Sequence, residues 1–400
     1  MKLLIFDPET AGHHPGYLRH LLRYWPDHHT HLIFVVSPEF ATHNPDVVQT
    51  PSVAQVTWQP ITQEELRWYE ESKRSVVRRS WVEWRLYSRY AHKVQADEGL
   101  IMYMDRFQLP MALRFFLPCK TSGIFFRPKF HYVHFVNHQL TGRERLHRER
   151  EQWLWRSALR HPQLNTLFCL DRLAVEPLQA LGGGANVVAL PDPVEIYPQS
   201  PTVVAALRRE LGIAPERTVL LLFGMIDRRK GIYQVLEALQ QLPAEQQTKL
   251  TFLMVGPLAS ADRGAITTTI STLRCETSLQ IVLCDRFIAD EEIQSYFALA
   301  DLVLALYQRH VGSSGILIRA AAAGKPVLAS EYGLMGELVR RHQLGLAVNS
   351  ADASRVANAI VHFLQVRTDE FNSVAAASWA QSNSAIKFSA TIQRNLLCLE

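Results

Sequence analysis

The sequence predicts an α/β chain of two doubly wound domains, each built on a parallel β-sheet with helices on both faces. Its 400 residues exceed what one ordinary core needs and suit two. From residue 218 onward, fully apolar runs alternate with amphipathic stretches, which is typical of parallel strands buried on both faces. A proline-rich stretch at residues 190–202 separates this half from a first half with a less regular alternation, so we expect a hinge there.

The C-terminal half contains the clearest elements. Strands are predicted at residues 218–226, 250–256, 279–284, 302–306 and 325–330, and helices at 231–242, 290–300 and 316–323. We expect Asp290 to be the N-cap of the second of these helices. Glu291 and Glu292 follow in its first turn, where acids interact favourably with the helix dipole.

The N-terminal half repeats the pattern. Strands are predicted at residues 2–6, 31–36, 99–104, 122–126, 166–170 and 186–190. We place one Rossmann-like domain over residues 1–195 and a second over residues 196–372. Residues 373–400 are expected to hold a C-terminal helix, and a return of that helix to the N-terminal domain is one option.

Composition and charge exclude several classes of protein. With 48% hydrophobic and 20% charged residues, the chain is globular, and a net charge of +4 does not by itself indicate a nucleic-acid partner. Five scattered cysteines without a CxxC pair are typical of reduced thiols in the cytoplasm. The opening run MKLLIF is too short for a secretory signal, and no apolar run reaches the ~20 residues that cross a bilayer. We predict a cytoplasmic protein whose membrane contact, if any, is peripheral.

A glycine- and serine-rich turn, Gly312-Ser313-Ser314-Gly315, follows one predicted strand and precedes the helix ILIRAAAA. Unpaired N–H groups and partial positive charge at a helix N-terminus attract anions, and small residues let a phosphate approach them. The turn therefore predicts a diphosphate site. The alternative is an ordinary serine N-cap.

Several segments in order around this turn carry a family resemblance. AAAAGKPVLAS resembles the "EAMAxGKPVVAS" segment of family 4 retaining glycosyltransferases, and FGMIDRRKGIYQVLEAL resembles their "GRLxxxKGxxxLLEAL" segment. FIADEEIQSYFALADLVLAL and LGLAVNSADASRVANAI are similar to two further motifs of that family. The resemblance covers roughly residues 218 to 365. It implies a GT-B fold, with two Rossmann-like domains facing across a cleft and a nucleotide-diphosphate sugar held mainly by the C-terminal one.

The resemblance also implies donor-binding residues. Lys230 corresponds to the lysine that contacts the donor diphosphate, where a cation stabilises the charge that grows on the leaving group, so no metal and no other cofactor is expected. Glu337 fits the "GGxxE" position, and the turn after the first strand lies where the family passes a loop beside the donor phosphate. The donor-binding set is Gly12, His13, His14, Gly16, Arg229, Lys230, Ser313, Ser314, Gly315, Arg319 and Glu337. The alternatives are a solvated helix start at residues 228–230 and a plain strand-to-helix turn at 12–16.

Two departures from the family stand out. Its acidic pair with E-x7-E spacing falls on Val311 and Arg319, so both carboxylates are missing. The arginine of its "GRL" segment is Met225, which leaves Arg229 as a substitute. Donor recognition must therefore differ, or activity must be absent.

Three residues are the candidates for the acceptor side and for catalysis. Asp105 ends one predicted strand and Arg127 follows another, so both should lie at the carboxyl edge of the sheet, where ligands bind. His131 is the third candidate. Together with His134 and His138 it could bind zinc if the segment were helical, but an extended segment would split the three between faces. A polar wall of the cleft is the alternative that we favour over a metal site.

Residues 67–93 carry eight basic and three acidic residues interleaved with aromatic ones. This pattern is typical of a basic amphipathic surface helix. Two interpretations stay open, docking on anionic lipid and an exposed helix packed through its aromatic stripe. The segment 143–160 carries more acids, and we interpret it as a solvated helix.

The leading hypothesis is a glycosyltransferase that moves a sugar from a nucleotide-diphosphate donor to a hydroxyl acceptor, a glycan, lipid or small molecule, with retention as the family resemblance implies. Nucleic acid is not an expected partner. Two alternatives stay open: an inverting transferase or epimerase on the same fold, which needs a protein base, and an inactive nucleotide-binding partner subunit.

Overall fold

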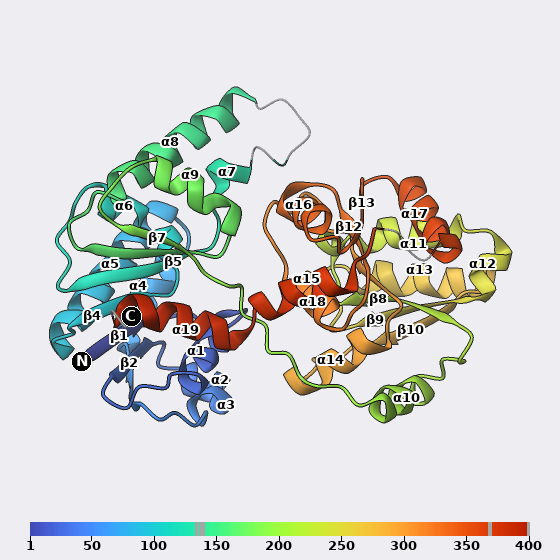
Figure 1. Ribbon diagram of the computed structural model, residues 1–400, viewed down its shortest axis with the longest axis horizontal. Coiled ribbons are helices and arrows are strands. Elements are labelled where there is room, and N and C mark those ends of the chain that lie inside the picture. The colour runs from blue at the N-terminus through green and yellow to red at the C-terminus, as the bar shows by residue number, and fades with distance from the viewer. Residues whose placement is uncertain (133–134, 136–140, 367–369, 398–400) are drawn as a thin grey trace. The chain divides into compact units, whose positions relative to one another are not determined.

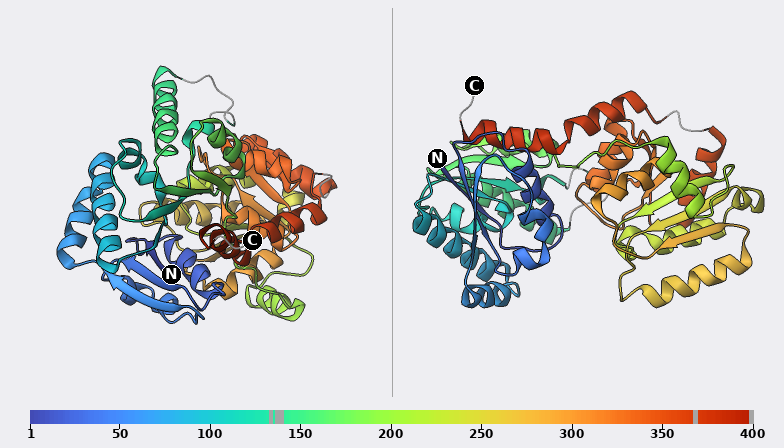
Figure 2. Two further views of the ribbon diagram at one scale, coloured as in Figure 1. Left: turned by 60° about the vertical axis from the view of Figure 1, so that its left-hand side comes forward. Right: turned by 90° about the horizontal axis from the view of Figure 1, so that it is seen from below.

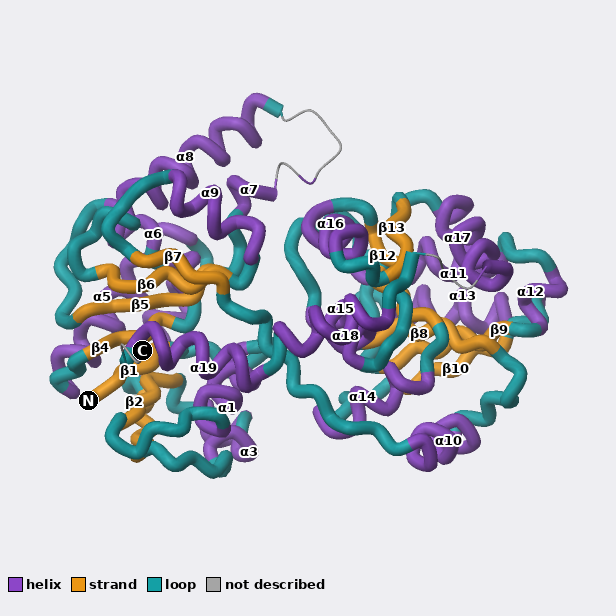
Figure 3. Tube along the Cα trace, viewed as in Figure 1, coloured by secondary structure: helices purple, strands orange, loops and turns teal. Residues whose placement is uncertain are grey.

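The computed structural model describes residues 1–132, 135, 141–366 and 370–397, and the chain divides into two compact units (Figure 1). The first unit holds most of residues 1–193 together with the segment from Ala385 onward, and the second holds Val194–Ser384. Each unit is a sheet covered by helices on both faces, as the orange strands and purple helices of Figure 3 show.

The first unit contains a seven-stranded parallel sheet with the order β3-β2-β1-β4-β5-β6-β7. Its strands are β1 Lys2–Phe6, β2 His31–Val36, β3 Gln55–Pro60, β4 Glu98–Ile101, β5 Lys120–Phe125, β6 Leu164–Cys169 and β7 Asn186–Ala189. Its main helices are α1 His14–Arg23, α4 Gln63–Ser72, α5 Val76–Val94, α6 Gln108–Ala112, α8 Gly142–Ala158, α9 Val175–Ala180 and α19 Ala385–Leu396; the short ones are α2 Phe40–His43, α3 Pro45–Val48 and α7 Lys129–Tyr132.

The last helix, α19, packs on the first unit. Its Phe388, Ile392 and Leu396 are buried in the same apolar cluster as Leu18 and Leu21 of α1. Figure 2 shows α19 beside α1 from two further directions. A segment at the end of the chain therefore completes one face of the sheet formed by its beginning.

The second unit contains a six-stranded parallel sheet with the order β10-β9-β8-β11-β12-β13. Its strands are β8 Thr218–Phe223, β9 Leu250–Val255, β10 Gln280–Cys284, β11 Leu302–Ala305, β12 Val327–Ser330 and β13 Gly345–Val348. Its helices are α10 Pro201–Glu210, α11 Ile232–Gln240, α12 Ala244–Thr248, α13 Arg263–Glu276, α14 Asp290–Leu299, α15 Gly315–Ala322, α16 Gly333–Arg341, α17 Ala353–Val366 and α18 Ser373–Ser382.

Each sheet has one point at which the strand order reverses. In the first unit this point lies between β1 and β4, and in the second between β8 and β11. The loops that leave the carboxyl ends of such neighbouring strands run to opposite sides and leave a crevice for ligands. These two places are where the fold itself directs the search for a site.

The predicted fold class is confirmed, and several local predictions are wrong. The N-cap of α14 is Ala289 rather than Asp290, although the acids do occupy its first turn. The strand predicted at 99–104 ends at Ile101, and Asp105 lies in a 3₁₀ turn, Met104–Arg106. Strands β3 and β13 were not predicted. The basic segment 67–93 is two helices rather than one, because Ser75 caps a new helix, α5.

Candidate functional site

Lys230 lies at the strand-order reversal of the second unit. It follows β8, its side chain is buried, and its ammonium group donates a hydrogen bond to the backbone oxygen of Phe223. The Nζ atom lies 4.8 Å from the ring centroid of Tyr307, which follows β11. Burial raises the pKa of the Tyr307 hydroxyl, but the groups around it, chiefly the neighbouring cation, together lower it more. The net pKa therefore lies below its usual value. The crevice between β8 and β11 is therefore electropositive.

Ser314 completes the group on the other side of the same ring. Its Oγ lies 3.0 Å from the Tyr307 hydroxyl, and it is the N-cap of α15, accepting a hydrogen bond from the N–H of Ile316 at 3.4 Å. The backbone oxygen of Ser313 lies 3.0 Å from Nε2 of His310, which orients the turn. Tyr307 thus joins Lys230 and the N-terminus of α15 in one cluster.

The loop that carries Lys230 depends on a glycine. Gly231 has a φ of +75°, and a Cβ there would lie 2.2 Å from the backbone oxygen of Leu306. This close approach holds the loop after β8 against the loop after β11. Arg229, half exposed, lies 5.2 Å from the Tyr307 ring centroid and 3.7 Å from Asp227, so a second cation borders the crevice.

The two other predicted donor residues of this unit have different partners. The guanidinium of Arg319 is largely buried, 3.9 Å from the carboxylate of Asp290, and burial lowers its pKa. Glu337 pairs with Arg341 at 3.1 Å and with Arg340 at 3.6 Å on its own helix. Within the described part of the chain, no hydrogen bond or ion pair joins either residue to Lys230.

The strand-order reversal of the first unit carries a buried carboxylate–imidazole pair. Asp7 follows β1, and each of its carboxylate oxygens lies 2.8 Å from Nδ1 of His14, at the start of α1. Gly12, with a φ of +72°, makes the turn between them, and Gly16 is the third residue of α1. Burial lowers the pKa of His14, but Asp7 raises it more, so the net pKa lies above its usual value. Asp7 was not among the residues predicted from the sequence, although it directly follows a buried strand.

Aromatic rings surround this pair. Tyr103, after β4, lies 5.7 Å from the His14 ring and 4.9 Å from Phe126, after β5. His13 lies 4.5 Å from His14 and 4.8 Å from Phe126, and burial, with the charge of His14, lowers its pKa to about 3. A polar pair within apolar walls is the usual composition of a small-molecule site.

Asp105 braces this edge of the sheet. Its carboxylate accepts hydrogen bonds from the backbone N–H of Phe126 at 2.9 Å and from that of Arg127 at 3.0 Å. Both oxygens are thereby occupied, which favours a positioning role over proton transfer. Burial raises the pKa of Asp105 to about 6. The Arg127 side chain is exposed, and His131 is buried in the short helix α7. His134 and His138 lie outside the described residues, and no group of three metal-binding side chains occurs among the residues that are described.

The internal network, formed by Glu9, Glu83, Arg79 and Arg106, was also not predicted from the sequence. The Glu83 carboxylate is buried and accepts hydrogen bonds at 2.8 Å from Arg79 and at 2.8 Å from Arg106. Glu9 contacts the same two cations; burial raises its pKa, but the Tyr69 hydrogen bond and the cations lower it to about 2. Only the i,i+4 spacing of Arg79 and Glu83 could have signalled part of this network.

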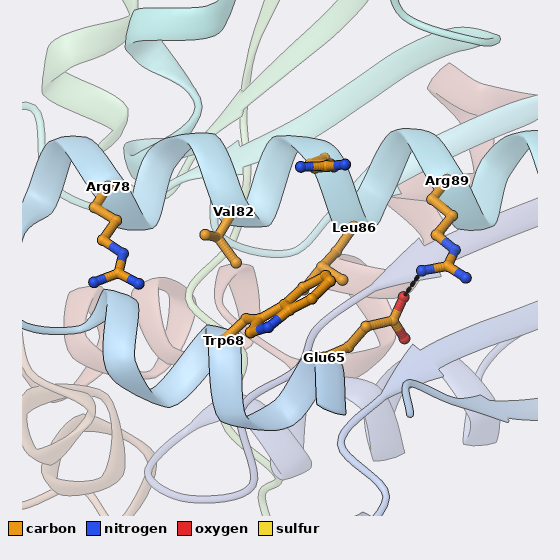
Figure 4. A pocket seen from close by; sticks show the side chains of 7 residues that line it. Glu65, Trp68, Arg78, Val82, Leu86 and Arg89 are labelled. Carbon is orange, nitrogen blue, oxygen red and sulfur yellow. Dashed lines mark hydrogen bonds and ion pairs between the residues drawn. The ribbon is translucent and has the colours of Figure 1, made fainter. Parts of the chain in front are cut away.

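Helices α4 and α5 enclose a groove, shown in Figure 4, with a volume of about 530 Å³. Trp68, Val82 and Leu86 give it an apolar lining, and its polar lining residues are Glu65, Arg78, Arg85 and Arg89. Arg89 is held by Glu65 at 2.7 Å. No helix within the described part of the chain is long and apolar enough to span a bilayer.

Comparison with known proteins relates one part of this chain to a known family. Residues 217–366 match the family model described as glycosyl transferases group 1. Residues 217–366 therefore form a group 1 glycosyltransferase region. The matched region contains Lys230, Tyr307 and Ser314, and the predicted family is confirmed over that region.

One curated relative and two solved structures are also similar to this chain. The lipopolysaccharide 1,2-N-acetylglucosaminetransferase of Salmonella typhimurium is 31% identical over 136 residues, 33% of this chain and 35% of the relative, so the match spans about a third of that protein. The structure of Anabaena HepE in complex with UDP and glucose has a TM-score of 0.65 at 19% identity and covers 100% of both chains. A UDP-forming α,α-trehalose-phosphate synthase of Burkholderia vietnamiensis has a TM-score of 0.65 at 13% identity, covering 99% of this chain and 97% of the other. Both likenesses show the GT-B fold.

Proposed function

We propose that this group 1 glycosyltransferase moves a sugar from a uridine-diphosphate donor to a hydroxyl acceptor. The observation that carries the proposal is the cluster of Lys230, Tyr307 and the Ser314 N-cap at the strand-order reversal of the second unit. The ring of Tyr307 lies between a buried cation and a helix N-terminus. Both groups stabilise a diphosphate leaving group, whose charge grows as the glycosidic bond breaks.

Uridine is the base that the relatives favour. HepE was solved with UDP, and the trehalose-phosphate synthase is named as UDP-forming. The Salmonella relative acts on lipopolysaccharide, so a glycan on a lipid carrier is the acceptor class that we propose. The missing carboxylates at Val311 and Arg319 leave the contacts to the ribose and the donor sugar to other residues.

A thermal-shift screen tests the donor proposal. UDP should raise the melting temperature more than GDP, ADP or CMP at equal concentration, because selective binding adds RT ln(1 + [L]/Kd) to the free energy of unfolding. At 100 times its Kd, UDP would add about 2.7 kcal/mol. An equal shift for all four nucleotides would contradict the choice of uridine, and UDP binding without transfer to any acceptor would favour the inactive-subunit alternative.

The Asp7–His14 pair favours a second candidate, an inverting transferase. Inversion requires a protein base, because the departing phosphate lies on the face of the sugar opposite the attacking hydroxyl. Neutral His14 could take that proton on Nε2 while Asp7 stabilises the imidazolium, as in other carboxylate–imidazole pairs.

His14→Gln separates the two candidates. A general base contributes about 10²- to 10⁴-fold, so an inverting enzyme should lose kcat by that factor while its KM for the donor stays near the wild-type value.

The wild-type rate should rise with pH through the raised pKa of His14, and Asp7→Asn should move that rise to lower pH. Nuclear magnetic resonance of the product gives its anomeric configuration. Retention of the anomeric configuration, together with a pH profile of His14→Gln that matches wild type, would contradict the inverting candidate and support the retaining mechanism. The exposed His147, changed to Gln, is the matched control.

A further inference from the structure

Large exposed apolar side chains gather on one part of the first unit, on α5, on α8 and in the loop that follows α6. They are Val76, Val77, Leu113, Phe115, Phe116 and Trp153, which we call the apolar face. Val76 is 83% exposed and Phe116 is 74% exposed. Soluble proteins seldom leave so many large apolar groups in one region without a binding role.

The loop at residues 113–116 is anchored to α5 by aromatic contacts. The Phe115 ring makes edge contacts with Trp81 and Trp84 of α5, with centroid distances of 4.7 and 5.5 Å. Arg114 has a φ of +56°, an unfavourable conformation for a side chain with a Cβ. The loop therefore keeps Phe116 exposed through fixed contacts of its neighbours.

Helix α8 borders the same loop. Ser157 of α8 donates a hydrogen bond to the backbone oxygen of Ala112 at 2.7 Å, and Nε2 of His161 lies 3.0 Å from the backbone oxygen of Phe115. Trp153 precedes Ser157 by one helical turn, which places it on the same side of α8. The side chains of the apolar face thus come from three adjoining segments.

Positive charge accompanies this face. Segment 67–93 exposes seven basic side chains and two acidic ones. Its other two charged residues, Arg79 and Glu83, pair with each other in the internal network. Within the described part of the chain, Arg74, Arg85 and Arg114 take part in no ion pair. Arg85 also lines the groove between α4 and α5, whose lining includes the exposed Trp68.

We propose that the apolar face and the basic segment 67–93 together dock on an anionic phospholipid bilayer. Exposed aromatic and aliphatic groups enter the headgroup boundary, while arginines attract anionic lipid by about 1 kcal/mol each near the surface. A second copy of this chain is a poorer occupant, because a symmetric contact would bring two surfaces of the same charge together. The proposal extends the function of the chain to the membrane that would hold a lipid-linked acceptor.

Vesicle co-sedimentation of the full chain tests the proposal. Wild-type protein should bind vesicles of phosphatidylcholine mixed with anionic phosphatidylglycerol, and bind pure phosphatidylcholine vesicles far less. Binding should fall steeply as salt rises. Phe116→Asp should weaken the partition by about tenfold or more, because it removes an aromatic anchor and adds an anionic charge. Arg85→Glu should weaken it by a similar factor and reduce its salt dependence.

The matched control is Phe287→Asp, since Phe287 is 82% exposed and belongs to the second unit, whereas the apolar face belongs to the first. It should bind vesicles like wild type. The proposal would be overturned if Phe116→Asp and Phe287→Asp bound anionic vesicles equally well. It would also be overturned if the wild-type chain did not bind anionic vesicles. Sedimentation that shows a dimer disrupted by Phe116→Asp, without vesicle binding, would assign the face to a second copy instead.

Discussion

Lys230→Met is expected to reduce kcat for sugar transfer by about 10²- to 10³-fold, the loss typical for removal of one group that stabilises transition-state charge. Methionine keeps the apolar stem that packs in the buried position over Tyr307 and removes only the ammonium group. The fold should therefore survive, which circular dichroism and melting temperature would verify.

Lys249→Met is the control for this substitution. Lys249 belongs to the same unit, but its side chain is 58% exposed and pairs with Glu245 on the surface. Its kcat should stay within about twofold of wild type, because exposed ion pairs contribute little. If Lys230→Met turned over as fast as Lys249→Met, the cation over Tyr307 would have no part in catalysis.

Glu83→Ala is expected to lower the free energy of unfolding by about 3–5 kcal/mol. The substitution removes one of the two carboxylates that contact both Arg79 and Arg106 and leaves Glu9 as the other, in a site with little access to water. Urea denaturation monitored by tryptophan fluorescence would measure the loss. The unfolding of the first unit should shift to lower urea, while nucleotide binding by the second unit stays intact.

Glu71→Ala tests whether burial is the cause. Glu71 also faces an arginine, Arg78, at 3.2 Å, but both side chains are 59% exposed. Its removal should change stability by less than about 1 kcal/mol. Equal losses for the two variants would show that the internal network has no special energetic role.

The sequence predicts the second unit better than the first, for a physical reason. Strands β8, β9 and β11 are continuous apolar runs of the kind that only a doubly covered parallel sheet requires. Strand β3 has mixed burial at the sheet edge, so its residues carry no such pattern. The break at residues 73–75 depends on the serine cap of α5, which the uninterrupted basic and aromatic pattern concealed.

The candidate site was predictable only in part. Lys230 and Ser314 each stand in a local pattern, but Tyr307, which joins them, is an ordinary residue after a strand. In the same way, His14 was visible in its turn, while its partner Asp7 and the ring of Tyr103 are brought to it by the strand order. Pairings across a strand-order reversal are set by topology, which local patterns do not contain.

Calorimetric titration of UDP and of uridine into wild type and Lys230→Met tests most directly whether the diphosphate binds beside Lys230. If the β8–β11 crevice cradles the two phosphates, the substitution should weaken UDP by at least about tenfold and leave uridine unchanged, in line with the 1.5–3 kcal/mol of a charge-assisted hydrogen bond. Identical UDP affinity in the two proteins would show that the phosphates bind elsewhere.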